Sequence, residues 1–394
     1  MRLLFPNFQI DSEFPGGNIV VESIDGDEVR VHQDLRDTSS DWFYWCLRVR
    51  GAERRTLRFV FTRSPALGVR GPAVSLDEGG TWNWLGSEAI EGNAFSYTFS
   101  EDTPEVRLSF AMPYQESRWR RFLNELGDNA AVSNHRLCTT AKGRDVEYVL
   151  LDCQSQEPQH QVVITCRHHC CEMMANYVLE GLVRWALSGN DAEARWFREK
   201  VSVLIVPFMD KDGVEEGDQG KNRYPRDHGR DYEGESLFAS TAALRGFLPQ
   251  WGRNRLSVGL DLHCPGITGK HHEVIYLVGS QDHRNAHEQQ RFSRILESVR
   301  SGPLPFLPAD YLPFGQAWNN IENYAGGKGF SEWVTEFPGV ALSTTIEIPY
   351  ANAGGAEVNQ VTSDLFGKDL GRALASYLRT LPTRGHNHRT EVTR

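Results

Sequence analysis

The sequence has no apolar run near the roughly 18 residues that a membrane-spanning helix requires. Residues 1–6 have too short an apolar core for a secretory signal peptide, so we expect a cytoplasmic protein that does not contact a membrane. An excess of basic residues is also missing. The net charge of −10 argues against nucleic acid as a partner.

The cysteines lack both the regular spacing of a disulfide framework and a Cys-x-x-Cys pair. Seven of them occur in the chain, and free thiols in a reducing compartment are their expected state. Cys170, Cys171 and Cys264 lie close to the polar segments discussed below. Since thiolates are good zinc ligands, a cysteine-rich metal site remains an alternative.

Residues 1–115 predict an all-β domain. Short alternating or aromatic-rich runs recur between turn signals such as Gly16-Gly17-Asn18, and this spacing favours a β-sandwich. The run Trp42-Phe43-Tyr44-Trp45 predicts a central strand whose large side chains belong to the core. The expected strands are 28–32, 42–49, 56–61, 73–77, 95–99 and 106–111.

Strands and helices alternate in residues 116–381, which predicts an α/β domain with helices on both faces of a largely parallel sheet. The expected strands are 147–152, 162–166, 201–207, 257–263, 274–278 and 343–348. The expected helices are 118–126, 172–188, 192–200, 241–251, 286–301 and 361–381. The polar residues 382–394 are expected to form a frayed tail.

Polar residues with metal-binding potential follow two of these strands. The strand 162–166 runs into an elbow with His169-x-x-Glu172, and His263 ends the strand 257–263. Ligands in such folds gather beyond the carboxyl ends of the strands. Two histidines and a glutamate would leave a zinc ion open for catalysis. His168 competes with His169 but lacks the three-residue spacing to Glu172.

Glu347 stands in the apolar strand 343–348, where a carboxylate is costly to bury without a specific use. A general base and acid beside the metal is the favoured interpretation, and a salt-bridged strand carboxylate is the alternative. Asp261 should share a face with His263, and its expected role is a structural hydrogen bond. His271 and His272 either line the cleft or belong to a surface loop.

The segment 211–230 concentrates basic residues in an acidic protein: Lys211, Lys221, Arg223, Arg226 and Arg230. Arginine forks suit planar carboxylates, so the segment could hold an anionic substrate. The alternative is a solvated loop whose charges pair with Asp218, Asp227 and Asp231.

Taken in chain order, these motifs resemble those of the zinc metallocarboxypeptidases, and more narrowly the cytosolic carboxypeptidase branch. The matching segments are His169-x-x-Glu172, 210–213, 227–230, His263 and 345–347. Residues 14–19 and 41–45 are similar to the β-sandwich that precedes the catalytic domain in that branch. The resemblance therefore covers nearly the whole chain. It implies a carboxypeptidase-like mixed sheet in residues 116–381.

The resemblance implies a role for each matching residue of the metal site. His169, Glu172 and His263 would hold one Zn²⁺ per chain, and Glu347 would be the catalytic carboxylate. Asp227 would accept a hydrogen bond from the first histidine ligand and fix its tautomer.

The resemblance also implies substrate contacts. Arg230 would grip the terminal carboxylate of a substrate, and Lys221 or Arg223 would stabilise the oxyanion. Tyr324 is the candidate for the mobile tyrosine of the family.

Two positions depart from the family pattern. Gly229 replaces the asparagine that accompanies the carboxylate-binding arginine, so Asn222 or His228 could take over this contact. Asp-Lys-Asp-Gly at 210–213 replaces Asn-Pro-Asp-Gly and changes the local charge.

The expected function is a zinc metallocarboxypeptidase that hydrolyses C-terminal residues of peptides or proteins. Glutamate and other acidic residues are plausible C-terminal substrates because of the basic loop. One alternative is a zinc amidohydrolase that acts on N-acyl amino acids or cell-wall peptides. Another is a non-catalytic zinc module whose β-sandwich recruits a partner.

Overall fold

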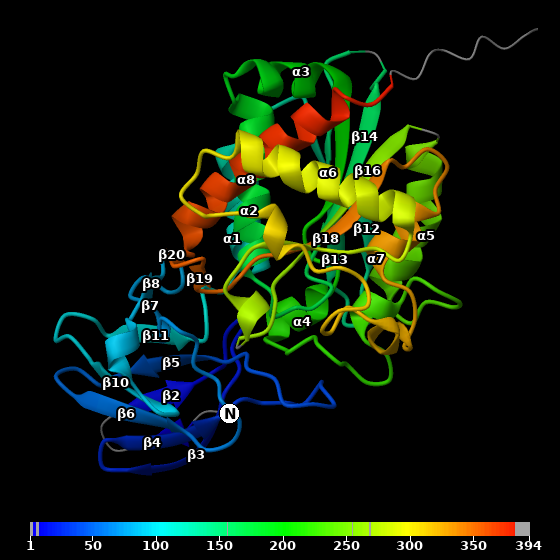
Figure 1. Cartoon of the computed structure of the whole chain (residues 1–394). Helices are drawn as coiled ribbons and strands as arrows, with labels where there is room; N and C mark the ends of the chain where they lie inside the picture. The colour runs from blue at the N-terminus through cyan, green and yellow to red at the C-terminus, as the bar shows by residue number, and fades with distance from the viewer. Residues whose placement is uncertain (1–2, 5–7, 156, 254, 268, 383–394) are drawn as a thin grey trace, which may run out of the picture.

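The chain folds into a smaller β-rich domain and a larger α/β domain (Figure 1). The computed structural model describes residues 3–4, 8–155, 157–253, 255–267 and 269–382. The predicted α/β fold with a preceding β-sandwich is confirmed. The predicted tail lies, from residue 383 onward, outside the described residues. No described helix combines the length and the apolar character that spanning a membrane requires.

Two antiparallel-rich sheets face each other in the N-terminal domain. The core between them is aromatic: the rings of Phe59 and Phe95 stack with centroids 4.9 Å apart, and Trp45 stacks on Phe95 at 5.8 Å. One sheet has the order β1 (Leu3–Leu4), β2 (Gln9–Asp11), β5 (Cys46–Arg50), β11 (Glu105–Ser109), β7 (Ala73–Ser75) and β8 (Asn83–Trp84). The other has the order β3 (Val20–Asp25), β4 (Glu28–His32), β6 (Thr56–Phe61), β10 (Ala94–Thr98) and β9 (Ile90–Glu91).

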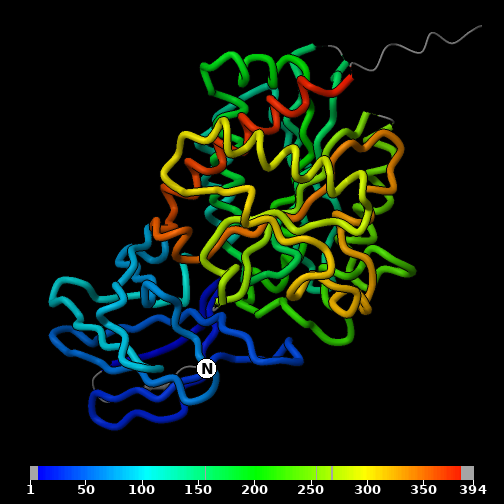
Figure 2. The backbone as a smooth tube through the Cα atoms, viewed as in Figure 1, coloured from blue at the N-terminus to red at the C-terminus, as the bar shows by residue number. Residues whose placement is uncertain are grey.

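The expected strand 42–49 is wrong in its first half, because β5 begins only at Cys46. The backbone of Tyr44 is hydrogen-bonded to a side chain of the larger domain: its N–H donates to Gln219 Oε1 (2.8 Å) and its carbonyl accepts from Gln219 Nε2 (2.9 Å). These bonds replace pairing with a neighbouring strand. Phe43, Tyr44 and Trp45 are buried as expected, whereas Trp42 is only half-buried. Figure 2 follows this blue segment from the sandwich toward the larger domain.

The larger domain is built on a mixed seven-stranded sheet. Its central strands β15, β14, β16 and β18 are parallel, and β12, β13 and β17 pair antiparallel at the edges. Every residue of β14 and β16 is buried, as expected for parallel strands covered on both faces. The sheet order is β12 (Val132–Thr139), β13 (Asp145–Leu151), β15 (Val201–Val206), β14 (His160–Cys166), β16 (Leu256–His263), β18 (Leu342–Glu347) and β17 (Tyr276–Val278).

Alternate residues of β14 belong to two different cores. Val162 and Ile164 pack in the larger core with α2 (Met174–Ser188), α6 (His283–Val299) and α8 (Gln360–Leu378). Val163 packs in a smaller core with α5 (Ala239–Gly252) and α7 (Phe330–Thr335). Helices therefore cover both faces of the sheet (Figure 1). In such folds a site forms beyond the carboxyl ends of the parallel strands. The remaining helices are α1 (Glu116–Glu125), α3 (Ala192–Lys200) and α4 (Lys211–Glu216).

Helices α2 and α8 approach each other through glycines. A Cβ on Gly367 would lie 2.0 Å from the carbonyl oxygen of Val178, and a Cβ on Gly181 would lie 1.8 Å from that of Asp364. Only glycine allows this backbone contact.

Replacing Gly367 with alanine is expected to lower the free energy of unfolding by about 1–3 kcal/mol or more, because the new methyl group meets backbone that cannot rotate away. Chemical denaturation would measure the change. Gly246→Ala on α5 is the matched control, since a Cβ there meets nothing within 4 Å. An equal loss in both variants would contradict the packing argument.

Candidate active site

Three side chains converge at the carboxyl ends of β14 and β16. His169 Nδ1 lies 2.8 Å from Glu172 Oε1, His263 Nδ1 lies 2.7 Å from Glu172 Oε2, and the two Nδ1 atoms are 3.2 Å apart. His169 follows β14 and His263 ends β16, and these two strands are parallel neighbours. The structure thus brings together the three residues that the sequence predicts as metal ligands.

A carboxylate stands behind each imidazole. His169 Nε2 lies 2.8 Å from Asp227 Oδ1, and His263 Nε2 lies 2.8 Å from Asp261 Oδ2. Burial alone would lower the pKa of His263, but Asp261 and Glu172 outweigh it and raise that pKa well above its ordinary value. With each Nε2 facing a carboxylate, the two Nδ1 atoms face Glu172. A cation that took the place of the Nδ1 protons would find a lone pair on each ring.

The donor set fits zinc. Two imidazole nitrogens and one carboxylate lie within 4.8 Å of one another and are buried. This set, with a fourth position open, is typical of catalytic zinc sites. The cysteine-rich alternative is contradicted, because the metal-capable groups found in the described part of the chain contain no cysteine. Cys170 Sγ instead donates to the carbonyl of Asp218, and all seven cysteines are free.

His168 forms a second group that could hold a metal ion, with Asp261 and His263, but its ring is hydrogen-bonded on both sides. Its Nδ1 lies 2.9 Å from Asp261 Oδ1 and its Nε2 lies 2.7 Å from the hydroxyl of Tyr232. Both ring nitrogens are therefore engaged, and the ring helps to hold Asp261 against His263. Thr165 Oγ1 donates to the same Asp261 oxygen at 2.8 Å. The structural hydrogen bond expected of Asp261 is present.

Glu347 lies beside the cluster at the end of β18, where it is the register partner of His263 on β16. Burial, followed by the neighbouring charge of Glu172, raises the pKa of Glu347 to about 7. Its Oε2 is buried and has no hydrogen-bond partner among the described residues. An acceptor in this state is free to exchange a proton with a bound molecule.

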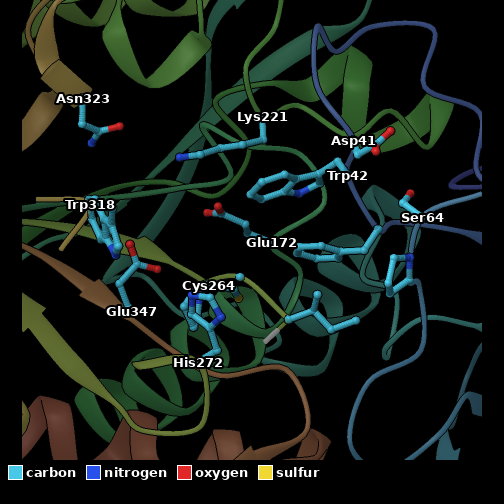
Figure 3. Close-up of a pocket in the computed structure, with 15 residues that line it drawn as sticks. Asp41, Trp42, Ser64, Glu172, Lys221, Cys264, His272, Trp318, Asn323 and Glu347 are labelled. Atoms are coloured by element: carbon cyan, nitrogen blue, oxygen red, sulfur yellow. The ribbon is translucent and has the colours of Figure 1, made fainter. Parts of the chain in front are cut away.

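A cavity of 520 Å³ opens over Glu172 and Glu347 (Figure 3). Both domains line it: Trp42 and Phe43 come from the sandwich, whereas Ile267 and Trp318 come from the larger domain. The sequence interpretation assigned the aromatic run 42–45 only to the core and missed its place in this wall. The remaining lining residues are Asp41, Ser64, Pro65, Lys221, Cys264, Pro265, Gly266, His272 and Asn323.

Lys221 is the residue of the basic loop that reaches this cavity. Its Nζ lies 3.5 Å from His169 Nε2, and its side chain extends toward the middle of the cavity with Glu172 and Glu347 (Figure 3).

The structure does not bring Arg223 to the cavity. Its guanidinium is ion-paired with Asp210 (2.5 Å), Asp218 (3.1 Å) and Asp37 (3.5 Å). Burial opposes the charge, but these carboxylates hold the pKa of Arg223 above its ordinary value.

Two more basic side chains of the loop are also engaged internally. Lys211 is fully buried and lies 2.8 Å from Glu147 Oε2, and Arg226 lies 2.8 Å from Asp231 Oδ1. The loop that could hold an anionic substrate therefore offers Lys221 to the cavity, while Lys211, Arg223 and Arg226 are paired within the protein. The pairs of Arg223 with Asp218 and of Arg226 with Asp231 agree with the alternative expectation of paired charges, whereas Lys211 is buried against Glu147.

Arg230 lies beyond the cavity wall, with its guanidinium 4.5 Å from the centroid of the Tyr324 ring. Its Nε donates to the carbonyl of Asn323 at 3.0 Å. The Tyr324 hydroxyl donates to Asn319 Oδ1 at 3.0 Å, and burial raises the pKa of Tyr324 to about 12. Of this group Asn323 lines the cavity, and its buried Nδ2 has no partner among the described residues.

Neither candidate for the missing asparagine reaches the cavity. The amide of Asn222 donates to Ser40 Oγ at 2.9 Å. His228 is buried against Phe238 with ring centroids 4.2 Å apart, and burial lowers its pKa to about 4. Asn323 was missed, although its place directly before Tyr324 was a possible signal. His272 lines the cavity, which was one of the two alternatives for this residue. His271 packs on the ring of Tyr276.

The resemblance to zinc metallocarboxypeptidases is confirmed by comparison with known proteins. The model of the zinc carboxypeptidase family matches residues 120–262, a segment that contains His169 and Glu172 and ends one residue before His263. An uncharacterised protein of Zymomonas mobilis is 25% identical over 212 residues, which cover 52% of this chain and 54% of that protein. Cytosolic carboxypeptidase 3 of Bos taurus is 24% identical over 247 residues, which cover 60% of this chain. The chain spans about half of the first relative and 23% of the second.

Solved structures share the whole fold at low sequence identity. A metallo-carboxypeptidase from Burkholderia cenocepacia aligns with a TM-score of 0.77 and 21% identity, covering 95% of this chain and 99% of that one. A metallo-carboxypeptidase from Pseudomonas aeruginosa, in complex with (2-guanidinoethylmercapto)succinic acid, aligns with a TM-score of 0.74 and 21% identity, covering 94% and 100%. The arrangement of a β-sandwich before a carboxypeptidase-like domain is therefore shared.

Replacing Asp261 with asparagine is expected to weaken zinc binding by about 10- to 100-fold, because an amide has one accepting oxygen and no charge, whereas the carboxylate faces His263 with one oxygen and His168 and Thr165 with the other. Competition with a coloured chelator would measure the affinity. Asp145→Asn, at a half-exposed surface carboxylate, is the control. Unchanged affinity in Asp261→Asn would contradict the assignment of Nδ1 as the ligand atom.

Proposed function

We propose that this protein is a zinc metallocarboxypeptidase that removes the C-terminal residue of a peptide or protein. The observation that carries the proposal is the convergence of His169, Glu172 and His263, with the free carboxylate oxygen of Glu347 beside them, under one cavity. A purely structural zinc site would use four protein ligands and would need neither the cavity nor Glu347. This argues against the non-catalytic alternative.

Zinc held by His169, Glu172 and His263 would polarise the scissile carbonyl and acidify the attacking water. Glu347 would take the proton of that water on its unpartnered oxygen and return it to the leaving amine. Its pKa of about 7 in the buried site is close to the range in which one group can accept and then donate a proton. Asp227 and Asp261 would hold the two imidazoles in the ligating tautomer.

We assign the oxyanion contact to Lys221, and Arg223 is no longer a candidate for it. The ammonium group extends into the cavity, where it can meet the charge that develops on the carbonyl oxygen. Arg223 would have to break its ion pairs with Asp210 and Asp218 to reach that position.

Recognition of the substrate carboxylate is assigned to Arg230, with Asn323 as the amide beside it in place of the missing asparagine. Asn323 supports this role because it lines the cavity, its amide nitrogen has no partner among the described residues, and its carbonyl holds the Arg230 guanidinium. A preference for acidic C-terminal residues has lost its support, since most of the basic loop pairs internally.

The seven free thiols fit a reducing compartment such as the cytoplasm.

A second candidate function is favoured by one observation. Arg230 does not line the cavity, so an amidohydrolase that ignores a free carboxylate would need no rearrangement. The two functions differ in their response to a blocked C-terminus.

Glu347→Gln is expected to lower kcat for peptide hydrolysis by about 10²- to 10⁴-fold, because the amide cannot accept the proton, while one zinc per chain remains bound. Release of C-terminal residues from a mixed peptide library and metal analysis of the same samples would measure both. Glu336→Gln, at an exposed glutamate, is the control. Full activity in Glu347→Gln would contradict the assignment.

We expect the enzyme to hydrolyse peptides that have a free C-terminal carboxylate and to leave the same peptides intact when the C-terminus is amidated. Arg230→Ala should lower kcat/KM for the free peptides by about 10- to 150-fold, the value of a lost hydrogen bond between charged groups of about 1.5–3 kcal/mol. Arg121→Ala, at an exposed arginine of α1, is the control. Equal turnover of free and amidated peptides would favour the amidohydrolase.

A further inference from the structure

The segment 34–44 of the β-sandwich runs along residues 217–222 of the larger domain. Gln219 is fully buried, and its side chain is hydrogen-bonded to this segment: Nε2 donates to the carbonyls of Asp34 (3.1 Å) and Tyr44 (2.9 Å), and Oε1 accepts from the Tyr44 N–H (2.8 Å). Figure 2 shows the blue segment beside the green loops. The two domains therefore share a backbone contact next to the active site.

Asp37 is the charged group at the centre of this contact. Its two carboxylate oxygens accept the N–H groups of Gln219 (3.0 Å) and Gly220 (2.8 Å), and its side chain is only 7% exposed. Gly220 is pressed between this carboxylate and the metal-binding elbow. It has φ +76, and a Cβ there would lie 2.3 Å from the backbone nitrogen of Cys170. The residue before Lys221 is thus held from both sides.

The residue after Lys221 is held as well. The Asn222 N–H donates to Asp227 Oδ2 at 2.7 Å, and its carbonyl accepts from the N–H (3.1 Å) and hydroxyl (3.0 Å) of Ser39. The other oxygen of Asp227 holds His169. The backbone on both sides of Lys221 is therefore anchored to the sandwich segment and to the carboxylate behind a metal ligand.

We infer that the β-sandwich is part of the active site and that Asp37 is a positioning residue for Lys221. The N–H groups of Gln219 and Gly220 donate to the Asp37 carboxylate, and these two hydrogen bonds fix the turn that aims the ammonium group into the cavity. Trp42, five residues further along the same segment, forms part of the cavity wall. This inference rests on the proposed function insofar as it concerns the role of Lys221 in catalysis.

A double-mutant cycle tests the inference. Lys221→Ala is expected to lower kcat by about 10²- to 10³-fold, as loss of an oxyanion donor does. Asp37→Ala is expected to lower kcat by about 10-fold or more with KM little changed, and to have less than about a twofold effect in the Lys221→Ala background. Equal losses in both backgrounds would overturn the positioning role. Asp34→Ala is the matched control, because the Asp34 carboxylate in the same segment contacts only Arg36.

A second readout does not depend on catalysis. The rate at which a lysine-acetylating reagent labels Lys221, measured by mass spectrometry relative to Lys368 on α8, is expected to change about threefold or more in Asp37→Ala and not in Asp34→Ala. Asp37→Asn keeps one accepting oxygen and should give an intermediate rate if the alanine variant does not fold. Unchanged labelling in a folded variant would overturn the inference. An inactive wild type with altered labelling would reject only the proposed function.

Discussion

The parallel register of β14, β16 and β18 is the constraint on which the site depends. Thr165 is the partner of Asp261, and His263 is the partner of Glu347. Because parallel strands end at the same edge of the sheet, this register delivers His263, Asp261 and Glu347 to one point. The elbow after β14 then needs only a few residues to add His169 and Glu172. A slip of one residue would turn these side chains to the other face.

Burial of so many charged groups is tolerated because each carboxylate faces a group that balances it. Asp261 faces His263 and His168, and its pKa is held below its ordinary value despite burial. Asp227 faces His169 in the same way. Glu347 is the exception: burial raises its pKa, and one of its oxygens has no partner among the described residues. A buried group whose pKa is shifted in this way is typical of a functional site.

The two domains are joined at the place where the chemistry occurs. The sandwich contributes Trp42 to the cavity wall, and its Asp37 holds the turn before Lys221. Arg36 adds an ion pair with Asp218 at 2.8 Å. These contacts explain why the aromatic run 42–45 does not continue β5, because its backbone is paired with Gln219 of the other domain. The geometry therefore connects the N-terminal domain to the cavity, through the positions of Lys221 and Trp42.

The elements and the metal cluster could be predicted from local patterns in the sequence. Alternating or continuous apolar runs mark the strands, and the spacing from His169 to Glu172 is a property of a single turn. The partners of the charged loop could not be predicted in this way. Whether Arg223 meets a substrate or Asp210, and whether Asn222 or Asn323 faces the cavity, depends on groups up to 182 residues apart in the chain. The sequence by itself thus predicted the fold class and the three side chains that converge as candidate metal ligands. Tertiary packing decided which cation reaches the cavity. Arg223 and Arg226 pair with Asp218 and Asp231 within the loop, but the contacts of Arg223 with Asp37 and of Lys211 with Glu147 join segments that folding brings together.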